Sequence, residues 1–306
     1  MAMLFLRRVV QMALILLGVA AITFVLLYAL PADPARMIAG RSATAQTVAN
    51  IRRELGLDQS LPVQFWSYLS NLLQGNLGRS YAQKTEVATL IVARLPATLT
   101  LMFSGIVVEV VLGLTLGTIA AVRRGGFVDR VVMMASFVGV SAPQFVVALL
   151  LLYVFAATLG WFPMSGYGTF SHVVLPAATL GVLGAGWYAR MVRSAMIDVL
   201  NQDYVRTARA KGLSSRRITF RHALPNAVLP VIAMIGIDIG QFMGGVVVVE
   251  AVYGWPGIGQ LAWQAIQQVD IPIIMGVTLT SALAIILGNL VADLIAPVID
   301  PRIRTR

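Results

Sequence analysis

Cysteine is absent from the sequence, and charged residues are scarce. Without cysteine, the 306 residues cannot contain a disulfide, a thiolate metal site or a cysteine nucleophile. Asp, Glu, Lys and Arg together make up 12% of the chain, whereas a soluble globular domain has roughly a quarter. Hydrophobic residues make up 58%, and the mean hydropathy is +0.83. These values exclude an ordinary soluble domain and predict a chain that lies mostly in lipid or inside a helix bundle.

The motifs of common catalytic sites are also missing. A phosphate-binding P-loop needs Gly-Lys followed by Ser or Thr, but neither Lys84 nor Lys211 follows a glycine. The two histidines, His172 and His222, lie outside any His-Glu-x-x-His pattern, and there is no Gly-x-Ser-x-Gly elbow. We therefore expect a non-catalytic chain that binds no cofactor or metal itself, and any ATP-driven work would need another chain.

Six apolar stretches are long enough to cross a bilayer as helices, because a helix rises about 1.5 Å per residue. The strands of a β-barrel would be shorter and alternating. The sequence therefore predicts an all-α membrane protein with six transmembrane helices. A secretory signal peptide is the alternative for the first stretch, but this run is long for one and no Ala-x-Ala site precedes Pro31. The six stretches are Val9–Leu30, Ala97–Val122, Val131–Leu159, Val173–Ala189, Ala227–Val249 and Ile273–Ile295.

The distribution of Lys and Arg predicts the topology. Residues 1–8, 123–130, 190–222 and 302–306 hold two, three, eight and three basic residues, and all four segments lie on one side of a six-span arrangement. The two short loops on the opposite side, 160–171 and 251–271, hold none. Because basic loops tend to stay in the cytoplasm, both termini are expected there. Topology thus explains most of the net charge of +10, and nucleic-acid binding is not expected.

These spans divide the chain into three parts. Residues 1–30 form the N-terminal cytoplasmic end and the first transmembrane helix, 31–96 an external loop, and 97–306 a five-helix transmembrane core with a cytoplasmic loop at 190–225. Within the external loop, helices are expected at Val48–Leu55 and from about Ser60 to Gly75. Small-xxx-small spacing, which lets helices approach closely within the chain or against a partner, occurs at Gly113–Gly117, Gly236–Gly240 and Gly240–Gly244.

The cytoplasmic loop carries the largest cluster of basic residues and shows helix-capping signals. Asp203 is predicted to cap a short helix, Tyr204–Lys211, and Gly212 suits the left-handed position that ends it. One serine of Ser214–Ser215 is predicted to cap a second helix, which Pro225 ends. Spacing alone leaves two interpretations open: a rigid surface for another protein, or a solvated loop that carries topology signals.

This loop resembles the "EAA" loop of ABC-importer permeases. The resemblance extends from Arg206-Thr207-Ala208 through Gly212 to Leu224-Pro225. The family pattern has Glu-Ala-Ala first and Ile at the position of His222, and the Arg-Thr-Ala of this chain is common in the peptide-permease branch. Further segments resemble the same dipeptide, oligopeptide and nickel permease family, so the resemblance covers essentially the whole chain: Pro31–Pro34, Glu54–Asp58, Gly75–Ser80, Val249–Leu261 and Ile299–Arg304.

The resemblance implies a type I ABC importer permease fold in a bacterial inner membrane. It also implies several partners: a homologous second permease, two ATPase subunits that hold ATP and Mg²⁺, and an external substrate-binding protein. In this family the loop docks into the ATPase and transmits its motion to the membrane helices. The residues of this chain that would couple to the ATPase are Asp203, Tyr204, Arg206, Thr207, Ala208, Arg209, Gly212 and Leu213.

Two further groups of residues are functional candidates. Acids inside predicted spans are costly, so Glu109 and Asp238, together with Gln241, are candidates for the translocation path. Pairing with a partner subunit is the alternative for the two acids, and a local structural role is expected for Asp293. The turn after the fifth span fits an aromatic belt, and by resemblance it is an external gate or a contact for the binding protein; its residues are Glu250, Tyr253, Trp255, Pro256 and Gly257.

The expected function is therefore that of a permease subunit for short peptides, including glutathione. A permease for nickel, opines or another small solute of the same family is the alternative. A stand-alone secondary transporter would predict internal repeats, and none is clear in the sequence. A membrane-embedded enzyme is disfavoured by the missing catalytic motifs.

Overall fold

The computed structural model describes residues 2–29, 34–40, 43–54, 56–243 and 246–299, and this part of the chain is helical without a β-strand. The prediction of an all-α fold is thereby confirmed for the described residues. Several sequence features lie outside the described residues, namely Pro31–Asp33, Gly244 and the tail 300–306, as does the side chain of Asp293. The longest helices are α1 (Ala2–Ala29), α5 (Val87–Val122), α6 (Phe127–Ser141), α8 (Phe170–Leu200), α12 (Leu229–Met243) and α15 (Ile271–Ile299).

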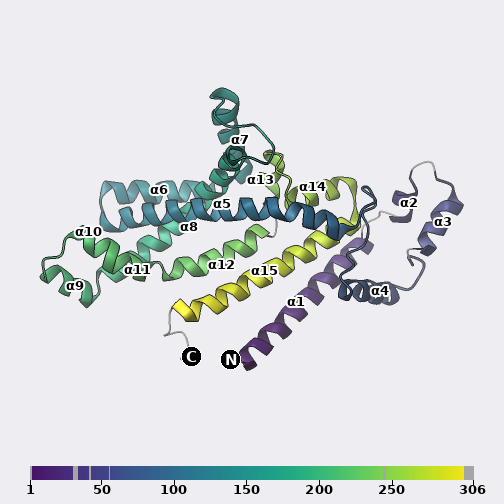
Figure 1. The fold of residues 1–306 in the computed structure, drawn as a ribbon, viewed down its shortest axis with the longest axis horizontal. Coiled ribbons are helices and arrows are strands. Elements are labelled where there is room, and N and C mark those ends of the chain that lie inside the picture. Colours follow the sequence, from purple (N-terminus) through teal and green to yellow (C-terminus); the bar gives the residue numbers. More distant parts are fainter. Residues whose placement is uncertain (1, 30–33, 41–42, 55, 244–245, 300–306) are drawn as a thin grey trace.

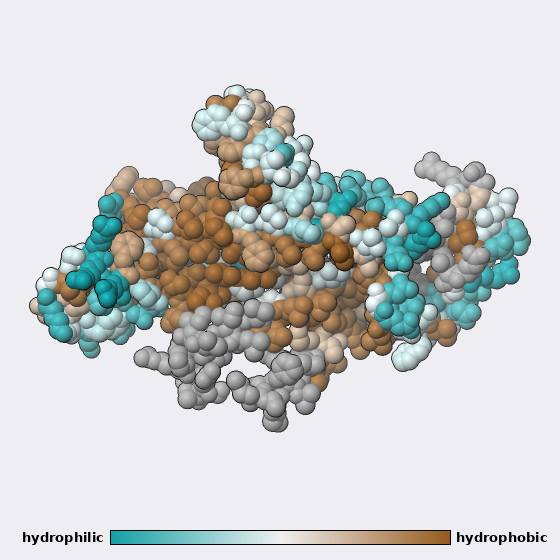
Figure 2. All heavy atoms as spheres, in the orientation of Figure 1, coloured by the Kyte–Doolittle hydropathy of each residue, from teal (hydrophilic) through white to brown (hydrophobic). Residues whose placement is uncertain are grey.

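The two polar parts of the chain lie at opposite ends of these long helices. At one end are α9 (Asp203–Ala210) and α10 (Ser215–Arg217), and at the other are α2 (Pro34–Ala39), α3 (Ala45–Glu54) and α4 (Leu61–Leu73) (Figure 1). Figure 2 shows that hydrophobic residues cover the middle of the visible face, whereas hydrophilic residues gather at both ends. An apolar band between two polar ends is the arrangement that a bilayer requires.

Three of the described helices, α5, α8 and α15, are long and apolar enough to cross a membrane. The number rises to five if each of two bent helix pairs forms one span. The described apolar part of α1, Val10–Leu26, is shorter than a full span. The count of six spans and the cytoplasmic position of both termini therefore stay predictions.

Glycines let α5 and α8 pack with their backbones close together. A Cβ atom on Gly113 would lie 2.1 Å from the Cβ of Tyr188, and one on Gly117 would lie 2.6 Å from the carbonyl oxygen of Ala189. In the opposite direction, a Cβ on Gly181 would lie 2.1 Å from Val108. The Gly113–Gly117 spacing thus serves packing within the chain. α5 also begins at Val87, upstream of the predicted apolar run, because Pro96 is accommodated inside the helix.

Replacing Gly113 with alanine is expected to destabilise the protein by about 1–3 kcal/mol, because the new methyl group has no room against Tyr188. The measurement is the thermal unfolding midpoint of the purified protein in detergent, followed by circular dichroism. Gly18→Ala is the matched control, since a Cβ there meets nothing within 4 Å. Equal midpoints for the two variants would contradict close packing of α5 and α8.

The predicted span Val131–Leu159 is not one straight helix. The segment consists of α6, α7 (Gln144–Leu151) and the π-helix η1 (Leu152–Thr158), and the second half is bent by 105° relative to the first. The bend lies at Ser141–Pro143, because proline disfavours the helical conformation of the residue before it. Ala142 accordingly has ψ 132°, which is extended. The prediction of a single continuous helix was wrong here, since apolar length was counted without regard to Pro143.

The end of the loop at 190–225 also differs from the prediction. Pro225 does not end a helix but lies inside α11 (Leu224–Ala227), directly after the π-helix η2 (Ile218–Ala223). Proline is tolerated in the first turn of a helical segment, where its missing N–H costs little. The chain therefore continues from α10 through η2 and α11 into α12, with a bend of 48° before α12. The last elements are α13 (Val247–Val252), α14 (Ile258–Gln268) and α15.

Candidate functional site

The loop at 190–225, which is predicted to be cytoplasmic, contains a compact helical unit. Val205 and Ala208 on α9 are buried against Ile218, and the half-buried Leu213 packs on the same cluster. α9 ends as predicted at Gly212, whose φ is +76°. The N–H of Gly212 donates to the carbonyl of Arg209 at 2.9 Å, which closes the turn. The loop is therefore held in one shape by its own contacts.

The helix α9 begins one residue earlier than expected. Asp203 is its first residue rather than its cap, and the cap position belongs to Gln202, whose side chain makes no capping bond. The Asp203 carboxylate instead lies 3.5 Å from Arg206, in an exposed pair. For the second helix, Ser214 is the capping serine, because its Oγ accepts from the N–H of Arg217 at 3.4 Å.

Most of the predicted coupling residues are exposed, but not all. Ala208 is buried, and Leu213 is half-buried, so both stabilise the loop from within. The exposed members are Asp203, Tyr204, Arg206, Thr207, Arg209 and Gly212. A depression beside them is lined by Arg216, Arg217, Arg221, Phe220, Ser214 and Pro225. This face of the loop is therefore basic, with single aromatic rings among the arginines.

Tyr204 connects α9 to the helices that lead into the membrane. Its hydroxyl lies 3.4 Å from the carbonyl oxygen of His222 and accepts from the side-chain amide of Asn226 at 3.1 Å. Asn226 also donates to the carbonyl of His222 at 2.9 Å. Asn226 was not predicted from the sequence, because a single polar residue after Pro225 carries no recognisable pattern. The three residues provide a direct mechanical link between α9 and α11.

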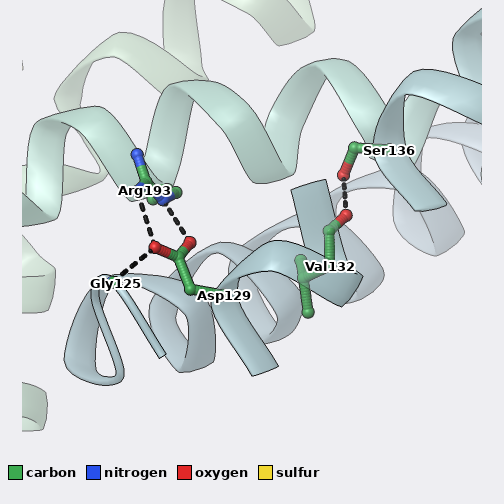
Figure 3. Close-up of polar contacts among 5 residues, drawn as sticks. All are labelled: Gly125, Asp129, Val132, Ser136 and Arg193. Carbon is green, nitrogen blue, oxygen red and sulfur yellow. Dashed lines mark hydrogen bonds and ion pairs between the residues drawn. The ribbon is translucent and has the colours of Figure 1, made fainter. Parts of the chain in front are cut away.

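An ion pair joins α6 to α8 beside the short loop between α5 and α6 (Figure 3). Arg193 donates to Asp129 through Nε at 2.5 Å and through a terminal nitrogen at 2.7 Å, and Gly125 N–H donates to the same carboxylate at 2.8 Å. Asp129 is buried, with 3% exposure. The hydrogen bonds from Arg193 lower the pKa of Asp129 from 3.8 to about 2. This pair was not predicted, since its members lie far apart in the sequence.

Asp129→Asn is expected to cost roughly 1.5–3 kcal/mol of stability at neutral pH. Because the folded pKa of Asp129 lies below its ordinary value, the pair contributes fully above about pH 4 and its contribution is lost as the pH falls towards 2. Thermal unfolding at neutral and acidic pH measures this, with the exposed Asp203→Asn as control. If wild type and Asp129→Asn lost equal stability on acidification, the ion pair would not be the cause.

Two of the acids inside the predicted spans, Glu109 and Asp238, lie against neighbouring turns of α8. Asp238 on α12 accepts a hydrogen bond from the hydroxyl of Tyr188 on α8. The Glu109 carboxyl on α5 lies beside Gly184, one turn before Tyr188 on α8. Glu109 is 3% exposed and packs against Gly184, which has no side chain to displace it. Gln241 is exposed on α12. Tyr188 was not predicted as a member of this group.

The turn before α14 is arranged around a buried carboxylate. Glu250 is fully buried and accepts from the N–H of Gln260 at 2.8 Å and from the Thr98 hydroxyl at 3.1 Å. Thr98 in turn accepts from the N–H of Ile258 at 2.8 Å. Gly257 is required there, because a Cβ would lie 2.0 Å from a Glu250 oxygen. The carboxylate thus satisfies backbone donors at the start of α14.

The aromatic residues of this turn are buried as well. Tyr253 donates to the carbonyl of Ala148 at 3.0 Å, and Trp255 donates through Nε1 to the carbonyl of Ala97 at 2.9 Å. Trp255 has no exposed surface, and only Pro256 among the five predicted contact residues is partly exposed. A role of this turn in contacting a binding protein stays a prediction. Since these aromatic side chains are buried, such a contact would be made by other, exposed parts of the loop.

A second buried carboxylate, not predicted from the sequence, lies at the far end of α14. Asp270 accepts from the Ser80 hydroxyl at 2.5 Å and from the N–H of Ala82 at 2.9 Å. The preceding residue, Val269, has φ +52°, a left-handed conformation that β-branched residues rarely adopt. These bonds hold the segment before α5 against the start of α15.

Comparison with known proteins gives a consistent match over the whole chain. The family model "Binding-protein-dependent transport system inner membrane component" matches residues 113–305, and the model of the N-terminal part of such components matches residues 1–102. The glutathione transport system permease protein GsiC of Salmonella typhi is 42% identical over 299 residues, which cover 98% of each chain. The GsiC protein of Escherichia coli (strain K12) is 41% identical over 298 residues, or 97% of each chain.

Solved structures with the same fold are more distant in sequence. Two inward-facing crystal forms of the MetNI methionine ABC transporter match with TM-scores of 0.58 and 0.59, at 20% and 22% identity. The matches cover 69% of this chain in both cases, and 97% and 96% of the MetNI chains. At this identity the likeness concerns the fold.

Proposed function

Because the chain belongs to the family of binding-protein-dependent transport system inner membrane components, we propose that it is the permease subunit of an ATP-driven importer for short peptides or glutathione. Membership also places it in the inner membrane. The observation that carries the proposal is the cytoplasmic loop: a self-supporting helical unit with an exposed basic face, connected by Tyr204 to the helix that enters the membrane.

The contacts of the loop indicate how a movement of the ATPase could be transmitted to the membrane helices. An ATPase subunit that engages the exposed face of α9 moves the loop as a unit, since Val205, Ala208 and Ile218 hold it together. The bonds among Tyr204, His222 and Asn226 pass this displacement to α11. α11 leads directly into α12, which carries Asp238. ATP hydrolysis on the partner is thereby coupled to a helix that bears a polar group inside the membrane.

The proposed assembly contains a homologous second permease, two ATPase subunits that hold ATP and Mg²⁺, and an external binding protein. Exposed apolar side chains along α5, such as Phe103, Val107 and Val111, are between 57% and 60% exposed in the single chain. An apolar surface of this kind is covered either by lipid or by a second permease. The substrate class rests on the relatives, which are named as glutathione permeases.

The test is purification of the tagged chain from its native membrane in mild detergent, with mass spectrometry of the proteins that accompany it. We expect a second permease and one or two ATPases with P-loops. The purified assembly, reconstituted with its binding protein, is then expected to take up labelled glutathione or a dipeptide when ATP is supplied. A chain that purifies alone, or an assembly that takes up neither solute, would contradict the proposal.

A further inference from the structure

The polar cluster of Glu109, Asp238 and Tyr188 has a closed side and an open side. Glu109 and Tyr188 are 3% and 1% exposed, so the α5 and α8 side of the cluster is closed. Asp238 is only partly buried, and its neighbour on α12, Gln241, is exposed. Residues three apart in sequence lie on one face of a helix, so Asp238 and Gln241 open onto the same surface.

The charge of this cluster is not balanced within the described part of the chain. Asp238 accepts a hydrogen bond from the hydroxyl of Tyr188, which is neutral and does not balance the charge of an ionised carboxylate. No ion pair with Lys or Arg is found for either acid among the described residues. Moreover, Oε2 of Glu109 is buried and has no hydrogen-bond partner in this same part of the chain. A negative charge without a counter-charge is costly inside a membrane, and a bound cation would lower this cost.

The negative charge is best placed on Asp238. The Tyr188 hydroxyl donates to this carboxylate, and such a bond stabilises the ionised form. Asp238 is also the acid that reaches the open face of α12, whereas Glu109 lies behind it against Gly184. A cation that approaches along α12 therefore meets Asp238 first, with the amide oxygen of Gln241 as a second acceptor.

We propose that Asp238 binds the primary ammonium group of the transported solute as it passes α12, with Glu109 and Tyr188 as positioning residues. The inference rests on the proposed function, because a short peptide or glutathione carries a free ammonium group. An ammonium group has three N–H donors, and Asp238 and Gln241 supply carboxylate and amide acceptors on one face. A solute whose amine is acetylated lacks the charge and is expected to bind this site poorly.

Chemical labelling tests the site without any measurement of transport. Dicyclohexylcarbodiimide reacts with carboxylic acids in apolar surroundings, so it should modify Glu109 and Asp238 in the complete importer in nanodiscs. The extent of labelling at Glu109 and Asp238 is read by peptide mass spectrometry. Glycylglycinamide, which carries a free ammonium group, is expected to slow the labelling several-fold, and N-acetyl-glycylglycinamide is not. Equal effects of the two compounds, or no effect of either, would overturn the proposal.

Uptake provides the second measurement. Asp238→Asn keeps the shape of the side chain but removes its charge, and we expect uptake of a dipeptide to fall about tenfold or more. Thr278→Val is the matched control, because the exposed Thr278 hydroxyl on α15 donates to the carbonyl of Ile274 within its own helix. Wild-type uptake by Asp238→Asn would overturn the proposal. If the wild-type importer takes up no peptide, the proposed function fails, while the labelling experiment still decides the ammonium site.

Discussion

An importer that contains Gly212→Pro is expected to take up almost no solute, although its permease still inserts into the membrane. Gly212 has φ +76°, whereas the ring of proline fixes φ near −65°. Proline also removes the N–H that donates to Arg209 at 2.9 Å. The combined cost of about 3 kcal/mol or more corresponds to a loss of roughly a hundredfold in the population of the native loop. The measurement is ATP-dependent uptake in proteoliposomes, together with ATP hydrolysis.

Two further variants separate coupling from general damage. Gly212→Ala is expected to reduce uptake only in part, because a left-handed alanine costs about 1–2 kcal/mol and its Cβ meets nothing within 4 Å. Gly160→Pro is the matched control, since Gly160 has φ +64° and equally open surroundings outside the cytoplasmic loop. Normal uptake by Gly212→Pro, or an equal loss in Gly160→Pro, would count against this loop as the coupling element.

Glu250→Ala is expected to destabilise the protein by about 3 kcal/mol or more. The substitution leaves the N–H of Gln260 and the hydroxyl of Thr98 without their acceptor in a fully buried position. Each buried donor without a partner costs about 1–3 kcal/mol. The start of α14 also loses a favourable negative charge, and a cavity forms beside Gly257. Thermal unfolding of the purified protein measures the loss.

Glu250→Gln provides the graded comparison. Glutamine keeps the volume and one acceptor oxygen but loses the charge, so its cost is expected to lie between those of wild type and alanine. Arg94, which donates to the Gln260 side chain at 3.0 Å, is unchanged in both variants. If Glu250→Ala unfolded at the wild-type temperature, the carboxylate would not be what holds this turn. Loss of uptake with unchanged stability would instead favour a direct role at the external mouth.

The prediction from sequence succeeded where the signal is local. Gly212 was placed correctly because a left-handed helix end favours glycine, and this preference depends on the backbone of a few residues. Ser214 was one of two predicted caps for the same reason. The prediction failed at Pro143 and Pro225. The chain bends sharply before Pro143, whereas Pro225 lies inside the helix α11. A proline interrupts a helix at an interior position but is tolerated in the first turn of a helical segment. The sequence does not show in which of these positions a proline lies.

The candidate site was predicted residue by residue but not as an arrangement. Glu109 and Asp238 were singled out because acids are costly in a membrane, yet their positions beside Gly184 and Tyr188 of α8 depend on how α5, α8 and α12 pack. Tyr188 joins them only because Gly113 lets α8 approach α5 closely. Tyr253 and Trp255 were expected at an aromatic belt, and their burial follows from hydrogen bonds to Ala148 and Ala97 on other helices.

The sequence by itself determined the class of protein, since apolar length and scarce charge permit little other than a helical membrane protein. It also determined the position of the basic loop along the chain and the family, because both depend on local residue spacing. Only the tertiary structure decided which polar groups share a site. Asp129 with Arg193, Glu250 with Thr98, and Asp238 with Tyr188 are pairs far apart in the chain. Their contacts arise from helix packing, in which many weak interactions along whole helices decide which side chains meet.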